Sequence, residues 1–400
     1  MRKIKLGDVV GENGVFVDGD WVESKDQNPN GSVRLIQLAD IGIGEFKNKS
    51  NRFLTEEKSR ELGCTYLKSG DLLLARLPDP LGRTCVFPGF DYKCVTAVDI
   101  CIIRIENPEV DRDWLMYTLN SPIMKEEISK YTTGTTRKRI SRKNLQKIEI
   151  PLPTLSEQKA IVAKLNRAQR LIDIDREMLA KYDDLIQSVF LEMFGDPVSN
   201  EKGLKQKEFG ELVEITGGYA FKSKDFVDDE SGVKVAKIAN VHFIDLDWSE
   251  VQYLPIESLK EHEKYSLKEG DILLALTRPI INSLDAVKAV VVKESDLPAL
   301  LNQRVARIRV DSDEVTEDYI TSFIYTQHFK RQIEKYSSTS LQPNVSNKEV
   351  SKIKVLVPEI EQQRKFSRIR QLILNERDAL EMNHKKSEEL FSSLVQGVIG

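Results

Sequence analysis

The chain has 400 residues, 40% hydrophobic and 30% charged, which is enough for two ordinary globular domains and additional helices. No apolar segment typical of a signal peptide follows the first residues, and no apolar run approaches the roughly 20 residues of a membrane span, so we expect a cytoplasmic protein. The net charge of −4 lowers the expectation of nucleic-acid binding without excluding it, because a basic face can coexist with an acidic remainder. The four cysteines lack the close pairs of a zinc site and are expected to pack as small hydrophobic residues.

The first 150 or so residues predict a compact mixed α/β domain. Short apolar runs typical of strands, at 72–75, 99–105 and 148–150, are separated by clusters of Gly, Pro, Asn and Asp. One helical stretch is expected over 113–131.

A basic, hydroxyl-rich segment, residues 131–143, lies near the end of this domain and contains five cations, four threonines and no acidic residue. Lys and Arg neutralise phosphates, hydroxyls and Gly amides position them, and Arg reads guanine edges through paired hydrogen bonds. A solvated charged loop is the alternative interpretation. The candidate DNA contacts here are Thr133, Gly134, Thr135, Thr136, Arg137, Lys138, Arg139, Arg142 and Lys143.

A long helix is expected to begin at Thr154. Thr154 and Glu157 form a capping-box pattern after Pro153, and no Gly or Pro occurs again before Gly195. Apolar residues then recur at alternating spacings of three and four, with one polar gap at Asp175, as in a coiled-coil seam. The seam residues are Ile161, Leu165, Ala168, Ile172, Leu179, Tyr182, Ile186, Val189 and Met193.

The second half of the chain repeats the first. Residues 67–75 recur at 267–275 with seven of nine positions identical, an offset of 200. The offset then becomes 205, and the match continues over 114–153. Order and spacing kept over this distance predict two domains of the same fold.

Two loops differ between the copies. The loop after the repeated strand carries Arg76 and Arg83 in the first copy and Arg278 in the second. Such divergence fits a variable contact loop, although surface loops also diverge without a function, and the two interpretations weigh equally.

The second copy's counterpart of the basic segment has hydroxyl and amide side chains but no cations. Gln and Asn suit adenine edges, so the copies could read different half-sites, but a simple polar turn at Pro343 and Asn344 explains the segment at least as well. The candidate contacts here are Ser340, Gln342 and Asn344.

A second long helix is expected from Pro358 to the end, less regular than the first. The seven-residue spacing is kept by Phe366, Ile373, Leu380 and Leu394, with Ser387 at the missing step. The other seam position is supported by Ile369 and Leu390 and interrupted by Glu376 and Asn383. Gly397 suggests fraying near the end.

These patterns predict an α+β chain with two mixed α/β domains in tandem repeat, separated by two long helices that form an antiparallel coiled coil with pseudo-twofold symmetry. The expected boundaries are 1–152 and 198–357 for the domains, and 153–197 and 358–400 for the helical spacers. Two readers on a fixed spacer could address two half-sites of a duplex, whose equivalent groove faces recur every ~34–36 Å. A duplicated coiled-coil scaffold for proteins is the alternative, and architecture alone weighs the two equally.

Residues 151–161, PLPTLSEQKAI, resemble the P-L-P-x-L-x-E-Q signature that opens the first helical region of Type I restriction–modification specificity subunits. Residues 357–364 are similar to its second occurrence, and 193–197 resemble the segment that closes the first helix. The resemblance covers essentially the whole chain. Phosphate-binding, dinucleotide-binding and zinc-protease motifs are absent from the sequence, and its four histidines are scattered, so we expect no catalysis by this chain.

The resemblance implies two target-recognition domains, each binding one half of a bipartite, asymmetric site in double-stranded DNA. The helices would set the gap between half-sites and dock two modification (methyltransferase) subunits, and restriction (translocase/endonuclease) subunits would supply translocation and cleavage. No cofactor is implied for this chain; S-adenosylmethionine, ATP and Mg are expected in the partner subunits. A recognition subunit of a fused methyltransferase–nuclease would have the same sequence features. The target sequence cannot be read from the chain, because base readout depends on loop geometry and DNA shape.

Overall fold

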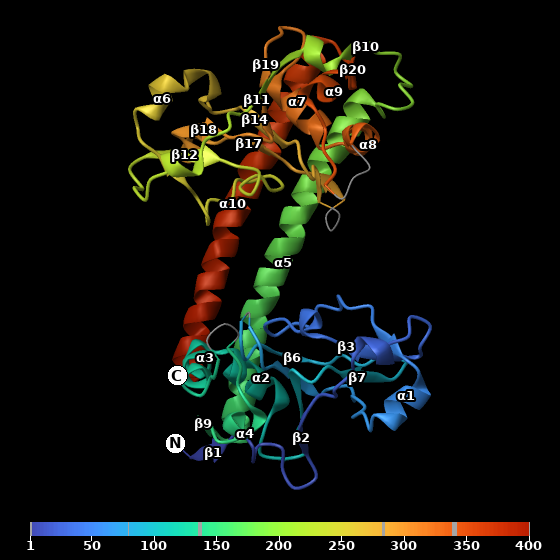
Figure 1. The fold of residues 1–400 in the computed structure, drawn as a ribbon, viewed down its shortest axis with the longest axis vertical. Helices are drawn as coiled ribbons and strands as arrows, with labels where there is room; N and C mark the ends of the chain where they lie inside the picture. The colour runs from blue at the N-terminus through green and yellow to red at the C-terminus, as the bar shows by residue number, and fades with distance from the viewer. Residues whose placement is uncertain (1, 79, 135–137, 282–284, 338–341, 400) are drawn as a thin grey trace. The chain divides into compact units, whose positions relative to one another are not determined.

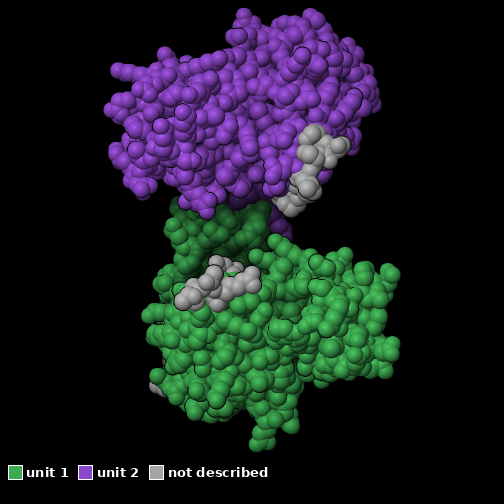
Figure 2. Space-filling view, in the orientation of Figure 1, with its two compact units in different colours: residues 1–176, 382–400 green, residues 177–381 purple. Residues whose placement is uncertain are grey.

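The computed structural model describes residues 2–78, 80–134, 138–281, 285–337 and 342–399. The chain forms two compact units, the first made of residues 1–176 and 382–400 and the second of residues 177–381 (Figure 2). Two long helices, α5 (Leu155–Phe194) and α10 (Ile360–Ile399), contribute residues to both units. In the described part of the chain, no helix is long and apolar enough to cross a membrane.

The first unit contains a four-stranded antiparallel sheet in the order β2-β8-β5-β6 and a three-stranded sheet in the order β4-β3-β7, in which β3 and β7 run parallel (Figure 1). The central strands β5 and β8 are almost entirely buried, which is why they read as continuous apolar runs in the sequence. The strands of these two sheets are β2 (Val15–Asp18), β3 (Val33–Ile36), β4 (Phe53–Leu54), β5 (Leu72–Ala75), β6 (Thr84–Val86), β7 (Cys94–Thr96) and β8 (Ile100–Arg104). A separate pair, β1 (Lys3–Lys5) with β9 (Glu149–Pro151), joins the start of the chain to the end of the domain.

The helical stretch expected over 113–131 is two helices, not one. Helix α2 (Arg112–Asn120) ends before Ser121, and α3 (Pro122–Lys130) begins at a proline. Pro122 has no backbone N–H to continue the first helix, and the Ser121 hydroxyl caps the second by accepting from the Met124 N–H at 3.2 Å. The first unit also has the short helices α1 (Glu56–Glu61) and α4 (Arg142–Leu145).

The second unit repeats this arrangement, as the internal repeat predicted. Its sheets have the orders β11-β19-β14-β17, β13-β12-β18 and β10-β20, and a small hairpin, β15 with β16, occupies the region where the second copy is longer. The strands are β10 (Lys205–Glu208), β11 (Val213–Gly217), β12 (Val233–Ala236), β13 (Tyr253–Leu254), β14 (Ile272–Ala275), β15 (Ile280–Ile281), β16 (Ala286–Val287), β17 (Ala289–Val291), β18 (Ala299–Leu301), β19 (Val305–Val310) and β20 (Lys354–Val357). The helices are α6 (Ser258–Glu261), α7 (Glu317–Ile324), α8 (Gln327–Tyr336) and α9 (Asn347–Ser351).

The same buried polar contacts recur in both units. The Asp71 carboxylate, 2% exposed, accepts two hydrogen bonds from Arg104, and Asp271, also 2% exposed, accepts two from Arg309, all at 2.7–2.8 Å. These pairs link the turn before β5 or β14 to strand β8 or β19. Because an unpaired buried charge is costly, each pair holds the register of its sheet.

Two glutamines at the starts of the long helices also match. Gln158 and Gln363 are both fully buried, and each amide bonds three backbone groups. Gln158 donates to the carbonyls of Glu109 and Pro153 and accepts from the Asp111 N–H. Gln363 makes the corresponding bonds in the second unit. The glutamine of the E-Q signature therefore fastens each helix to its own domain.

Helices α5 and α10 pack against each other in antiparallel orientation within each unit, as predicted (Figure 1). In the first unit, the Ser387 hydroxyl donates to Asp175 at 3.1 Å, so the polar gap of one seam faces the missing step of the other. In the second unit, Arg377 Nε donates to Asp183 at 2.8 Å, and the rings of Phe190 and Phe366 lie 5.6 Å apart.

The seam of α5 follows the prediction at buried positions as far as Ile186 and departs from it in the last two turns. Leu165, Ala168, Ile172 and Ile186 are buried, whereas Val189 and Met193 are only partly so. The fully packed positions there are instead Phe190 and Phe194, which contact Tyr319 and Phe366. The last turns of α5 contact a domain as well as α10, and this rotates the buried stripe by one residue.

One expectation for α10 was wrong. Leu390, assigned to the seam, is 55% exposed. The helix includes Gly397 and continues to Ile399. The two helices have equal lengths of 40 residues despite the weaker heptad of the second.

Candidate nucleic-acid interface

The two loops that differ most between the copies lie side by side in each unit. In the first unit, the Ile140 N–H donates to the Arg76 carbonyl at 3.3 Å, and the Arg76 N–H donates to the Asp99 carbonyl at 2.9 Å. In the second, the Val345 N–H donates to the Leu276 carbonyl at 2.9 Å, and the Leu276 N–H to the Arg304 carbonyl at 2.8 Å. The same backbone junction is thus built twice. Nothing in the sequence pattern predicted that these two loops are neighbours, and strand pairing brings them together.

The basic segment of the first unit is held at its base by a two-residue bridge. Thr133 and Arg139 exchange backbone hydrogen bonds of 2.9 and 2.8 Å, and Gly134 has a φ of +99°, a conformation that favours glycine. Thr133, Gly134, Lys138 and Arg139 are all exposed. Thr135, Thr136 and Arg137 lie outside the described residues.

The other two cations of the segment belong to the first turn of α4. The Ser141 hydroxyl caps this helix by accepting from the Asn144 N–H at 3.2 Å. Arg142 is half-buried beside the Phe16 carbonyl, whereas Lys143 is exposed. The segment therefore presents exposed lysines together with arginines that contact the protein.

Arg76 and Arg83 do not face solvent. Arg76 is 4% exposed, and its Nη2 donates to the Val98 carbonyl at 2.5 Å. Arg83 is 8% exposed and donates to the carbonyls of Ile41 and Leu38 at 2.8 and 3.0 Å, and to two carbonyls of its own loop. In place of the contact role expected from the sequence, we assign these two side chains to anchoring the loops, because both are buried and donate to backbone carbonyls inside the unit.

In the second unit, Arg278 reaches the polar segment. It is exposed, has a φ of +48°, and its N–H donates to the Pro343 carbonyl at 2.7 Å, while Thr277 bridges Asn344. Gln342 and Asn344 are exposed, and the Asn344 amide donates to the Gln342 carbonyl at 3.0 Å. Ser340 lies outside the described residues. Arg278 therefore places a cation next to the polar segment of the second unit, whose own residues carry no positive charge.

Sequence reasoning missed three residues of this surface. Asp18 and Asp99 contact the arginines of the first unit: Asp99 lies 3.1 Å from Arg139 Nη2, and Asp18 lies 3.3 Å from Arg76 Nε and 3.8 Å from Arg142 Nε. The third, Arg304, is exposed in the second unit at a φ of +66°. The repeat contained the signal, because the 205-residue offset pairs Asp99 with Arg304, a reversal of charge within a matched scaffold.

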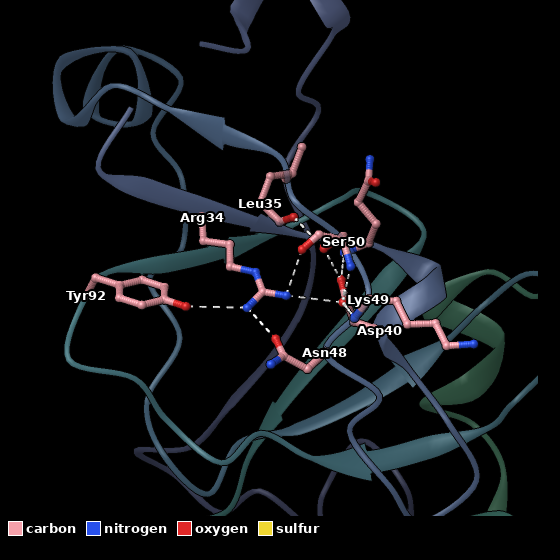
Figure 3. A network of polar contacts seen from close by, with 8 residues as sticks. Arg34, Leu35, Asp40, Asn48, Lys49, Ser50 and Tyr92 are labelled. Atoms are coloured by element: carbon pink, nitrogen blue, oxygen red, sulfur yellow. Dashed lines mark hydrogen bonds and ion pairs between the residues drawn. The ribbon is translucent and has the colours of Figure 1, made fainter. Parts of the chain in front are cut away.

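A second polar cluster lies in the three-stranded sheet of the first unit, and its side chains bond to groups within the unit. Asp40 is fully buried and accepts from the backbone N–H groups of Lys49 and Ser50, each at 2.7 Å, and from Arg34 at 3.3 Å (Figure 3). Arg34 also donates to Asn48 at 2.5 Å and to the Ser50 carbonyl at 2.9 Å. These bonds fix the segment 48–50 against β3, which is a structural role.

The cysteines pack as expected from the sequence. Cys85, Cys94 and Cys101 are buried, and burial raises the pKa of Cys85 to about 12 and that of Cys94 to about 11. Within the described ranges, no group of three His, Cys, Asp or Glu side chains could hold a metal ion.

Comparison with known proteins matches residues 3–181 and 201–390 to a family described as Type I restriction modification DNA specificity domain. The chain is 30% identical over 317 residues to the Type I restriction enzyme MjaVIII specificity subunit of Methanocaldococcus jannaschii, covering 74% of this chain and 73% of that relative. It is 22% identical over 435 residues to the EcoAI specificity subunit of Escherichia coli, covering 85% and 72%.

A solved structure described as the basis of complex assembly and conformational transition of the type I R-M system is similar in fold. Its TM-score is 0.56 at 17% sequence identity, and the alignment covers 100% of this chain and 97% of that one.

Proposed function

The chain belongs to the DNA specificity subunits of Type I restriction–modification systems, and we propose that each of its two units reads one half of a bipartite, asymmetric site in double-stranded DNA. The observation that carries the proposal is the backbone junction built twice with different side chains. One scaffold that presents lysines and arginines in one unit, and amides with Arg278 and Arg304 in the other, suits two readers of different half-sites.

Exposed cations supply the affinity in this proposal. Lys138 and Lys143 are exposed in the first unit and Arg278 and Arg304 in the second, so both surfaces can neutralise phosphates despite the overall charge of −4. Gln342 and Asn344 offer paired donors and acceptors that match adenine edges. Arg76 and Arg83 are left out of the contact set.

The long helices are the proposed dock for two modification (methyltransferase) subunits, with restriction (translocase/endonuclease) subunits completing a cytoplasmic complex. Large apolar side chains remain exposed along both helices, among them Leu171 and Met178 on α5 and Leu372 and Met382 on α10, at 41–67%. These side chains are the part of the helix surface that the docked subunits would cover in this proposal. The chain itself is proposed to bind no cofactor; S-adenosylmethionine, ATP and Mg belong to the partner subunits.

Methylation mapping tests the proposal. The chain is expressed with the modification subunit encoded beside it, and methylated adenines are mapped across the genome. The expected result is a two-part motif with a fixed gap. An unchanged methylation pattern would contradict DNA recognition and favour a protein scaffold.

Variants assign the half-sites. Replacing Lys138, Arg139 and Lys143 with alanine is expected to abolish or relax one half of the motif, and replacing Gln342 and Asn344 the other. Relaxation of the same half by both variants would contradict the assignment of one half-site to each unit.

A further inference from the structure

We infer that Asp99 and Asp18 are positioning residues that raise the sequence selectivity of the first unit by holding Arg139 and Arg142 of its basic segment. This inference rests on the proposed function, since it concerns how that unit discriminates between DNA sequences. It assigns a role to acidic side chains on a surface that binds a polyanion.

Two carboxylates form ion pairs with three guanidinium groups in this part of the first unit. Asp99 Oδ1 lies 3.1 Å from Arg139 Nη2. The Asp18 carboxylate bridges Arg76 Nε at 3.3 Å and Arg142 Nε at 3.8 Å. Asp18 also accepts from the Cys101 thiol at 3.4 Å, which helps to fix its carboxylate. Arg139 is exposed and Asp99 is partly exposed, at 44% and 27% of the two side chains, so this pair remains accessible.

Pairing with a carboxylate changes what an arginine contributes. The Asp99 carboxylate partly neutralises the charge of the guanidinium group, which therefore attracts phosphate less strongly. The sequence-independent affinity for DNA falls as a result. The same contact restricts rotation of the side chain, so its remaining donors point in a set direction at a smaller entropic cost. Base edges carry neutral hydrogen-bond acceptors at defined positions, so a donor that already points in the right direction binds them more favourably. The two carboxylates thus lower the sequence-independent affinity for DNA and raise the discrimination between DNA sequences.

The second unit indicates that the carboxylates are not needed to build the junction. Strand pairing aligns Asp18 with Gly217, and the repeat aligns Asp99 with Arg304. Even so, the backbone bonds of Leu276 match those of Arg76 within 0.4 Å. Asp18 also neutralises the buried Arg76, whose counterpart Leu276 carries no charge. A purely structural role does not account for Asp99, because its arginine, Arg139, is exposed and the junction forms without either side chain in the second unit.

The test measures binding by the assembled complex to a cognate duplex and a scrambled duplex over a range of salt concentrations. The probes are the wild-type chain and the Asp99→Asn and Asp18→Asn variants, each with its modification subunits. We expect Asp99→Asn to bind the scrambled duplex about 3–10-fold more tightly and to steepen the log–log salt slope by about one. The cognate-to-scrambled ratio should fall several-fold.

Two controls separate the explanations. Glu109→Gln removes an exposed carboxylate that pairs with Arg2 in the same unit, and it should leave the ratio and the slope unchanged. In an Arg139→Ala background, Asp99→Asn should have no further effect, because the carboxylate acts through that arginine. If Asp99→Asn steepens the slope equally in that background, direct repulsion of phosphate explains the effect and the inference is wrong.

The outcomes also distinguish this inference from the proposed function. Wild-type chain that fails to prefer any duplex contradicts the proposed function itself. Wild-type chain that discriminates, with Asp99→Asn and Asp18→Asn unchanged in ratio and slope, contradicts only the inference.

Discussion

The two units share a frame and differ at its surface. Asp71 with Arg104 matches Asp271 with Arg309, and Gln158 matches Gln363, down to the groups they bond. At the loop junction the backbone bonds are also shared, but Arg139, the Asp99 carboxylate and Arg142 correspond to Asn344, Arg304 and Asn347.

This contrast shows where the chain can vary. Buried polar pairs fix strand register, and losing either partner leaves a charge or a donor unsatisfied. The exposed loop side chains sit on backbone bonds that most residue types can make, so their chemistry can change at little cost to the fold. Two copies of one domain can therefore acquire different DNA specificities while they keep the same fold.

The largest expected difference between the units concerns their helix packing. Phe366 is fully buried against Phe190 and Phe194, whereas its counterpart Ile161 is only partly buried. Phe366→Ala should cost about 4 kcal/mol and Ile161→Ala about 1–2 kcal/mol, because the larger side chain leaves the larger cavity. Hydrogen exchange followed separately in each unit measures both. Equal losses would mean that the seam is packed alike in the two units.

The shared frame predicts equal effects at the buried carboxylates. Asp71→Ala and Asp271→Ala should each cost about 3 kcal/mol, because each leaves a partly buried arginine without its carboxylate. Denaturant titration with the same unit-resolved readout checks this. Glu127→Gln, which breaks an exposed pair with Lys130, is the matched control and should leave the free energy of unfolding nearly unchanged, because solvent screens the pair. A difference of more than about 2 kcal/mol between the two aspartates would break the equivalence of the units.

The loops should separate affinity from specificity. Lys138→Ala with Lys143→Ala should lower the log–log salt slope of DNA binding by about two, since each phosphate neutralised by a cation adds about 0.9 to the slope. Gln342→Ala with Asn344→Ala should leave the slope unchanged but reduce discrimination at one half-site by about 1–3 kcal/mol for each base that is no longer read. Salt titrations with duplexes altered in one half-site distinguish the two effects. Equal slopes for both variants would contradict the division.

The smallest effect concerns pH and should occur in the first unit alone. Burial raises the pKa of Asp20 from 3.8 to about 6, against the opposing effect of the Thr65 N–H, and the counterpart of Asp20 is Tyr219. The folded state therefore binds this proton more tightly than the unfolded state. The contribution to unfolding free energy is greatest below pH 4 and falls as the pH rises to about 6.

Asp20→Asn should remove that fall, by at most about 1 kcal/mol, because the group is half-buried and solvent screens it. Hydrogen exchange of the first unit between pH 4 and 7 measures the change, with the second unit as internal control. An unaltered pH profile in the variant would contradict the role of Asp20.

Much of the fold could be predicted from local pattern. The repeat predicted two like units, the capping box at Thr154 and Glu157 predicted the start of α5 within a residue, and the heptads predicted that the two long helices pack together. The break at Ser121 and Pro122 was also readable from the proline, although it was missed. These features depend on residues a few positions apart, or on order kept along the chain, and the sequence by itself determined them.

The candidate interface was determined only by tertiary structure. Arg76 and Arg83 looked like the cations of an exposed loop, and packing across 22 and 42 residues turned them inward to Val98 and Ile41. Asp99 became part of the surface because strand pairing sets it beside a segment 40 residues later. Which side chains meet at a junction of distant loops depends on strand register and burial, and one sequence pattern is compatible with many such arrangements.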